Sequence, residues 1–202
     1  MLKFDEQKQL DSVNGALALR SEIEFIVDGI CKKGYKNICW LGIGGTYASC
    51  LQAEVHMKER SAINFFVENA AEYLLTGNKK VGEGTIVVIS SVTGSTAEMV
   101  DGVRKVQEAG AKVIGFIDYP DTKLADMVDY LISYPNNEQL KFFMAADRFM
   151  YNAGEFDEYY ELYKELDEHL ACGLVEVEKA ADELGESIAR KHMNDSIHYF
   201  VG

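Results

Sequence analysis

The sequence predicts an α/β fold: a five-stranded parallel sheet between two helical layers, a flavodoxin-like three-layer sandwich. Three observations predict it. Five short apolar runs alternate with segments of helical period between about residues 35 and 135. The runs are rich in Val, Ile, Leu and Phe without polar alternation, which is typical of strands buried on both faces. The segments between them are long enough for the right-handed helical crossovers that parallel strands require.

The expected elements follow in chain order. Residues 10–33 have the apolar period of a helix, and Gly34 ends it. The buried-strand pattern predicts strands at Asn37–Leu41, Ile63–Val67, Thr85–Ser90, Lys112–Ile117 and Tyr130–Ser133. Helical period predicts crossover helices at Thr46–Lys58 and Thr96–Ala109.

The pattern changes after Pro135. Residues 137–193 contain no proline and carry an apolar and aromatic stripe at helical spacing, with Asn152-Ala153-Gly154 expected to separate two helices. Residues 195–202 read as a turn, a strand and a glycine, like the opening of the first strand–loop unit. We expect four parts: an N-terminal helical segment (1–34), an α/β domain (35–135), a helical extension (136–194) and the truncated start of a second similar domain (195–202). The alternative for the last part is a simple edge strand.

Composition limits the classes of function. The chain has 202 residues, with 33 acidic and 20 basic side chains and a formal net charge of −13. Such a surface repels nucleic acid and anionic membranes. No apolar stretch is long enough to span a bilayer, and the N-terminus does not read as a signal peptide. Four cysteines without a C-x-x-C pair indicate free thiols in a reducing compartment, so we expect a cytoplasmic protein.

Two loops follow predicted strands and open predicted helices. The first runs from Leu41 through Gly42-Ile43-Gly44-Gly45-Thr46, and the second is Ser91-Val92-Thr93-Gly94-Ser95-Thr96. In open parallel sheets this edge is where ligands bind, and helix N-termini favour phosphate. Hydroxyl groups donate hydrogen bonds to phosphate oxygens without adding charge. The alternative for the second loop is an ordinary Ser/Thr-rich turn with a helix cap.

Other site types fit less well. A dinucleotide fingerprint needs a third glycine where Tyr47 stands, and that residue should block close packing of helix on strand. The Gly-Lys-Ser/Thr of a nucleotide P-loop and the Gly-x-Ser-x-Gly elbow of hydrolases are missing from the sequence. His169 and Cys172 share a helix face, but two ligands without a third do not make a zinc site. We therefore expect no metal and no cofactor.

The two loops resemble those of the sugar isomerase (SIS) domain family. That family has a G-x-G-[TS]-S loop and a later S-x-S-G-x-T-x-[DE] loop, which residues 42–46 and 91–98 match. Between them, residues 67–73 (VENAAEY) are similar to a V-E-x-A-S-E-[FY] segment of the isomerase part of glucosamine-6-phosphate synthase. Gly45 and Val92 depart from the pattern, since each replaces a polar residue, so one side-chain contact is expected to be lost.

The resemblance implies a bound sugar 6-phosphate. Hydroxyl groups of Thr46, Ser91, Thr93 and Thr96 would hold the phosphate, helped by backbone N–H groups of the second loop. The implied binding residues are Gly44, Gly45, Thr46, Ser91, Val92, Thr93, Gly94, Ser95 and Thr96. The helical part after residue 137 looks most like the tandem-domain fructosamine 6-phosphate deglycases. These enzymes split a sugar–amine adduct into glucose 6-phosphate and an amine or amino acid.

The catalytic base is left open. The family commonly uses a glutamate to move a proton between C1 and C2, and Glu68 at the end of the second strand is the candidate here. The alternative for Glu68 and Glu72 is stabilisation of the following helix. The resemblance also implies that the chain alone is inactive or nearly so. The competing functions are a sugar-phosphate sensor without catalysis and an assembly module. The apolar helical arm predicts a homodimer or larger homo-oligomer.

Overall fold

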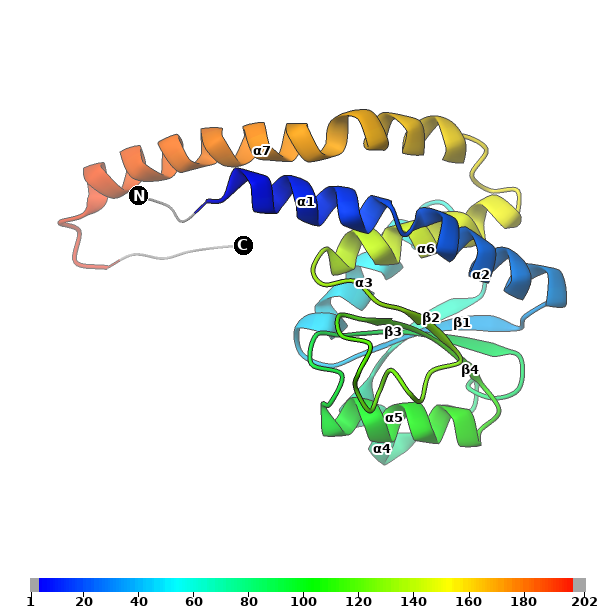
Figure 1. Cartoon of the computed structure of the whole chain (residues 1–202). Coiled ribbons are helices and arrows are strands. Elements are labelled where there is room, and N and C mark those ends of the chain that lie inside the picture. The colour runs from blue at the N-terminus through cyan, green and yellow to red at the C-terminus, as the bar shows by residue number, and fades with distance from the viewer. Residues whose placement is uncertain (1–3, 198–202) are drawn as a thin grey trace.

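The structure is a computed structural model that describes residues 4–197, and it contains the expected five-stranded sheet. The strand order is β2-β1-β3-β4-β5, and all neighbouring strands are parallel. Figure 1 shows the sheet in the lower half of the molecule, beneath two long helices. The strands are β1 (Asn37–Gly42), β2 (Phe65–Asn69), β3 (Thr85–Ser91), β4 (Lys112–Ile117) and β5 (Tyr130–Ile132). The predicted fold class is confirmed.

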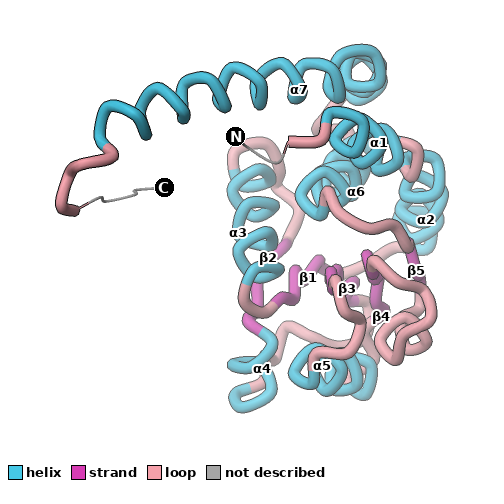
Figure 2. The backbone as a smooth tube through the Cα atoms, turned by 60° about the vertical axis from the view of Figure 1, so that its left-hand side comes forward, coloured by secondary structure: helices cyan, strands magenta, loops and turns pink. Residues whose placement is uncertain are grey.

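Helices cover both faces of the sheet, as Figure 2 shows. One face packs against α4 (Ala70–Thr76) and α5 (Ala97–Glu108), through a core that includes Tyr73 and Val103. The other face packs against α2 (Arg20–Lys33), α3 (Gly45–Lys58) and α6 (Glu138–Asn152). The central strands β1 and β3 are buried along their whole length, which explains their continuous apolar sequences.

The expected single helix over residues 10–33 is wrong. The structure has two helices there, α1 (Glu6–Leu17) and α2, joined at Ala18 and Leu19. Asp5 caps α1 by accepting a hydrogen bond from the backbone N–H of Lys8. The two helices pack on different neighbours, α1 on α7 (Tyr159–His192) and α2 on α6. Tertiary packing therefore overrides a periodicity that is continuous in sequence.

The helical part after Pro135 contains the two predicted helices. α6 lies directly on the sheet, where the ring of Phe142 is 4.9 Å from that of Trp40 and 5.8 Å from that of Phe116 (centroid distances). α7 has 34 residues and projects past the sandwich, with α1 alongside it (Figure 1). The division into four parts stays a prediction, and most of the proposed start of a second domain lies outside the described residues. All four cysteines are free, and no helix among residues 4–197 is long and apolar enough to cross a membrane.

Candidate functional site

The two predicted loops meet at one edge of the sheet. They leave the carboxyl ends of β1 and β3, which are neighbours with Leu41 opposite Ile89. Between them lies a cavity of about 250 Å³. Residues from both loops and from the helices that follow line it: Ile43, Gly45, Thr46, Ser90, Ser91, Val92, Thr93, Thr96 and Met99. Of the predicted binding residues, Gly44, Gly94 and Ser95 belong to the loops without lining the cavity. The binding roles of all nine stay predictions.

The loop after β1 is closed by a side chain of its own. The Thr46 hydroxyl accepts a hydrogen bond from the Ile43 N–H and donates one to the Ile43 carbonyl, both at 3.0 Å. This side chain therefore fixes the loop, and its proton is already in use. Gly42 allows α3 to lie close to the strand, since a Cβ there would be 2.7 Å from the backbone of Thr46 and Tyr47. The expected block to close packing at Tyr47 is thus wrong, because the contact is made at Gly42.

The loop after β3 is held by hydrogen bonds to Ser91 and to the segment after β4. The buried Ser91 hydroxyl accepts a hydrogen bond from the Gly94 N–H at 3.0 Å, and the Gly94 carbonyl accepts one from the Leu124 N–H. Gly94 has a φ of +61°, and a Cβ there would lie 2.1 Å from the Thr122 Oγ1. Glycine is required at this position for both reasons. Thr93 and Ser95 are both exposed, and Thr93 lines the cavity whereas Ser95 does not.

The two helices that open at the cavity have uncapped N-termini. Among the described residues, no side chain makes a capping hydrogen bond to α3 or α5. α4 starts from the same edge of the sheet, and there Asn69 Oδ1 accepts hydrogen bonds from the N–H groups of Ala71 and Glu72. The first-turn N–H groups of a helix have no partner within the helix. At α3 and α5 they remain available to an anion, supported by two helix dipoles.

The cavity is neutral. No ionisable side chain is among its lining residues, within the part of the chain that the structure describes. Two thiols on the elements that lead into the first loop and follow it, Cys39 on β1 and Cys50 on α3, are buried, and burial raises the pKa of each well above the ordinary value. They stay protonated and unreactive. The site offers backbone N–H groups and hydroxyls, which suits positioning an anion rather than moving a proton.

Glu68 lies on β2, outside the cavity lining. Its carboxylate accepts a hydrogen bond from the Asn78 side chain, which ties the end of β2 to the segment after α4. Glu72 is in the first turn of α4, where an acid stabilises the helix dipole. A role for Glu68 in proton transfer stays a prediction.

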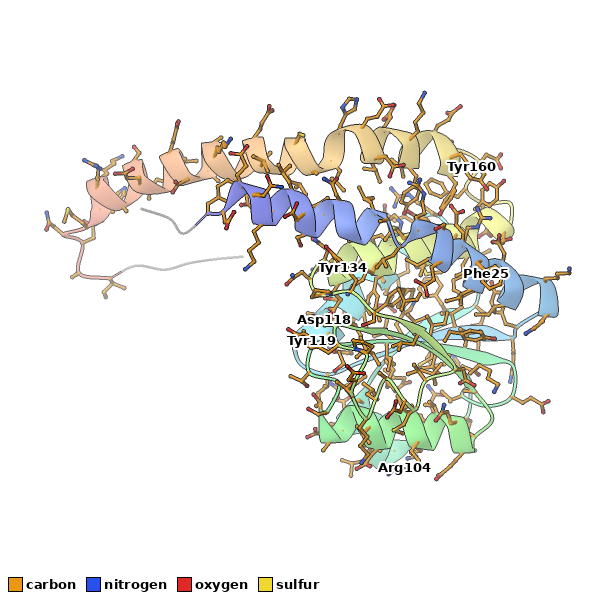
Figure 3. All side chains as sticks on the ribbon, in the orientation of Figure 1. Phe25, Arg104, Asp118, Tyr119, Tyr134 and Tyr160 are labelled. Atoms are coloured by element: carbon orange, nitrogen blue, oxygen red, sulfur yellow. The ribbon has the colours of Figure 1, made fainter. Side chains whose placement is uncertain are left out.

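The sequence reasoning missed a buried ion pair at the same sheet edge. Asp118 follows β4, and its Oδ1 lies 3.3 Å from the Nζ of Lys141 on α6. Lys141 is fully buried and also donates to the Tyr134 carbonyl at 2.7 Å, so it joins the segments after β4 and β5. Figure 3 labels Asp118 and Tyr134 on these two segments. Burial lowers the pKa of Lys141. The Asp118 N–H donates to the Ser91 carbonyl, so the pair anchors the base of the second loop. An acid directly after a buried strand was the available signal.

A second polar cluster lies between α3, α6 and α7. The His56 Nε2 is 2.5 Å from the Asp147 Oδ1, and Tyr163 donates to the other oxygen of that carboxylate at 2.7 Å. Burial raises the pKa of Tyr163, helped by the Asp147 charge. None of the three residues lines the cavity, so the cluster joins helices. His56 is thus partnered inside the chain.

Comparisons with known proteins identify relatives of this chain. The family model for the SIS domain matches residues 33–147. A glutamine–fructose-6-phosphate aminotransferase (isomerizing) of Sulfurisphaera tokodaii is 27% identical over 110 residues, which are 54% of this chain and 18% of that protein. The chain thus matches only a small part of this curated relative.

Solved structures share the fold. A Bacillus subtilis candidate phosphosugar isomerase superposes with a TM-score of 0.79 at 19% identity, covering 92% of this chain and 59% of that one. A protein of Escherichia coli CFT073, solved in complex with a sugar phosphate, gives a TM-score of 0.61 at 14% identity. That match covers 79% of this chain and 91% of the other.

Proposed function

Because the chain belongs to the SIS domain family, we propose that its two-loop cavity binds the phosphate of a sugar 6-phosphate. The observation that carries this proposal is the convergence of two uncapped helix N-termini on a neutral cavity lined by hydroxyl groups. Such a site suits a dianion, because N–H and O–H donors replace its water shell without a counter-charge. The sugar-phosphate complex of the Escherichia coli protein supports the same class of ligand.

We propose further that the whole protein is a fructosamine 6-phosphate deglycase of the cytoplasm, releasing glucose 6-phosphate and an amine or amino acid. The support is the similarity of the helical part after residue 137 to that branch of the family, whereas residues 67–73 resemble the isomerase part of glucosamine-6-phosphate synthase. The chain spans 59% of the Bacillus subtilis protein, so the groups that transfer protons belong, in this proposal, to a further domain or a neighbouring subunit. The expected turnover of the 202-residue chain alone is close to zero. Deglycation by this purified chain would contradict that expectation.

A second candidate is a sugar-phosphate sensor without catalysis. It is favoured by the absence of ionisable side chains from the cavity lining among the described residues. A sensor binds the same ligands but turns none of them over in any longer form of the protein. Turnover by an extended chain therefore separates the deglycase from the sensor.

The binding proposal is tested by thermal unfolding with glucose 6-phosphate, fructose 6-phosphate, a fructosamine 6-phosphate, the corresponding unphosphorylated sugars and inorganic phosphate. A ligand at 100 times its Kd adds about 2.7 kcal/mol of stability, a shift of roughly 5–10 °C for a chain of this size. We expect shifts with the 6-phosphates and none with the free sugars. No shift with any sugar phosphate, or equal shifts with the free sugars, would contradict a phosphate site between the loops.

A further inference from the structure

The charged side chain of Lys141 is fully buried at the sheet edge that carries the two loops. A buried ammonium group is costly unless it is paired and hydrogen-bonded. The Lys141 Nζ lies 3.3 Å from the Asp118 Oδ1 and donates to the Tyr134 carbonyl at 2.7 Å. The two partners follow different strands, β4 and β5. The positions of both segments therefore depend on the same ammonium group.

The Asp118 side of this contact leads to the cavity. The Asp118 N–H donates to the Ser91 carbonyl at 3.1 Å, and the Ser91 hydroxyl accepts a hydrogen bond from the Gly94 N–H. Ser91 is one of the residues that line the cavity. A single residue, Asp118, thus joins Lys141 to the second loop, by its side chain on one side and its backbone on the other.

The Tyr134 side of the contact leads to α1. The Tyr134 hydroxyl donates to the Asp11 carbonyl of that helix at 2.9 Å. α1 also lies directly on the tyrosine ring, since a Cβ added at Gly15 would be 1.9 Å from the Tyr134 hydroxyl oxygen. Figure 3 shows Tyr134 between α1 and Asp118. The packing of α1 on the sheet edge therefore depends on the segment that Lys141 holds.

The segment after Tyr134 has a strained backbone. Asn136 and Asn137 are consecutive and have φ values of +67° and +50°, in the left-handed region that side chains other than asparagine and aspartate rarely adopt. The Asn136 N–H donates to the Asp118 Oδ2 at 3.4 Å. The Asn137 side chain donates to the Ser12 hydroxyl of α1 at 2.5 Å. Such a backbone persists only while its surroundings impose it, so loss of the contacts at one end should affect the other.

We propose that Lys141 and Tyr134 are positioning residues of the phosphate site, through which the packing of α1 and the conformation of the second loop depend on each other. This inference deepens the proposed function and rests on it for the identity of the ligand. Neither residue lines the cavity, so both act on the ligand through the loop. A sugar phosphate that stabilises the loop must then also stabilise the packing of α1, because coupling between two sites is reciprocal.

The first test needs no ligand. Hydrogen exchange is measured by NMR at Gly94 in the loop and at Gly15 in α1, in the full chain and in two variants. Tyr134→Phe removes the hydroxyl that reaches α1. The double variant Asp118→Asn with Lys141→Met removes the ion pair without leaving an unpaired charge buried. We expect each variant to accelerate exchange at both glycines, at least about 5-fold.

The controls make the same kinds of change away from these contacts. Tyr163→Phe removes a hydroxyl that donates to Asp147. Lys105→Met, in the last turn of α5, removes an ammonium group that donates to the Tyr73 and Leu74 carbonyls. Both controls should leave exchange at the two glycines unchanged. Acceleration by Tyr134→Phe in α1 alone, or equal acceleration by the controls, would overturn the proposal.

The second test adds the ligand. In isothermal calorimetry, the affinity for glucose 6-phosphate should be at least about 5-fold weaker in Tyr134→Phe and in the double variant, and unchanged in both controls. Saturating glucose 6-phosphate should also slow exchange at Gly15 in the parent chain. Binding with neither effect would overturn the coupling. If the parent chain binds no sugar phosphate, the phosphate proposal fails, while the exchange rates of the first test still decide whether α1 and the loop are coupled.

Discussion

The loops after β1 and β3 form the two walls of one cavity but are built in different ways. The first is closed by its own Thr46, whose hydroxyl is fully engaged with the Ile43 backbone. The second depends on the rest of the sheet edge: Ser91 holds Gly94 from inside, and the segment after β4 supports it from behind. The conformation of the first wall therefore depends on contacts within its own loop, whereas that of the second depends on contacts with segments distant in sequence. Substitutions in the second wall should therefore lower the free energy of unfolding of the whole domain.

The largest difference is expected between two glycines. Gly94→Ala forces a side chain into Thr122 at a positive φ, so we expect a loss of about 2–4 kcal/mol in unfolding free energy. Gly44 has a φ of +57° and open space around it. Its ψ of −124° places it outside the left-handed helical region, so the matched change Gly44→Ala should cost only the backbone strain, about 1–3 kcal/mol. Urea unfolding of both variants measures the difference. Equal losses would mean that Thr122 moves aside freely.

Removal of the Ser91 hydroxyl should come next. Ser91→Ala leaves the buried N–H of Gly94 without its acceptor, which costs about 1–3 kcal/mol. It also removes a hydroxyl from the cavity, so sugar-phosphate affinity should fall. Ser95→Ala, one residue beyond Gly94 on the exposed side, is the control and should stay within about 0.5 kcal/mol of the parent chain. If both variants have the same free energy of unfolding, the Ser91–Gly94 hydrogen bond makes no net contribution to stability.

A smaller effect is expected at Thr46. Thr46→Val keeps the shape of the side chain and removes both hydrogen bonds to Ile43, with an expected loss of about 1 kcal/mol. Because the loop is then no longer held by these hydrogen bonds, the binding free energy of the phosphate should fall by more than the free energy of unfolding. Thr46→Ser retains the hydroxyl and should restore binding. Isothermal calorimetry with glucose 6-phosphate separates the three chains, and unchanged affinity in Thr46→Val would show that the loop holds its form without the hydroxyl.

Ligand binding at the two loops should not depend on pH, whereas the stability of the rest of the domain should. Burial raises the pKa of Cys31 from 9.0 to about 11 and that of Tyr35 from 10.0 to about 12. Folding therefore favours their protonated forms. This stabilisation is complete below about pH 9, and it is lost as the pH rises through about 11 and 12. The lowered pKa of Lys141 acts in the opposite direction.

Urea unfolding between about pH 7 and 11 should accordingly show stability falling above about pH 9. Affinity for a sugar phosphate should stay constant between about pH 7 and 9, because the ligand is already a dianion above its second pKa of about 6 and the lining residues do not titrate. A Cys31→Ala chain should lose the earliest part of the stability decline. A tenfold change in affinity between about pH 7 and 9 would mean that an ionisable group outside the lining takes part in binding.

The sequence predicts the location of the cavity because local rules determine it. Buried strands read as continuous apolar runs, and ligand loops of parallel sheets lie at strand carboxyl ends. The two loops could thus be placed together without coordinates. The same local reading fails at Ala18, where the chain bends so that α1 can follow α7 instead of continuing into α2.

Features that depend on residues distant in the chain could not be predicted from the sequence. Lys141 reads as an ordinary helix surface residue until Asp118 and the Tyr134 carbonyl, from two other segments, are placed around its ammonium group. Gly42 reads as the first glycine of a phosphate loop, whereas the structure gives it a packing role against the backbone of α3. In both cases the missing information is which backbone approaches which side chain.

The length of α7 affects how the molecule moves through solution. Its 34 residues make a rod of about 51 Å, while a compact domain of about 150 residues has a radius of gyration of about 15 Å. The frictional coefficient of the chain therefore depends on the projecting helix as well as on the mass. A single chain should diffuse and tumble like a larger sphere, and its elution volume in gel filtration would be mistaken for that of an assembly. Only methods that weigh the particle directly can count its chains.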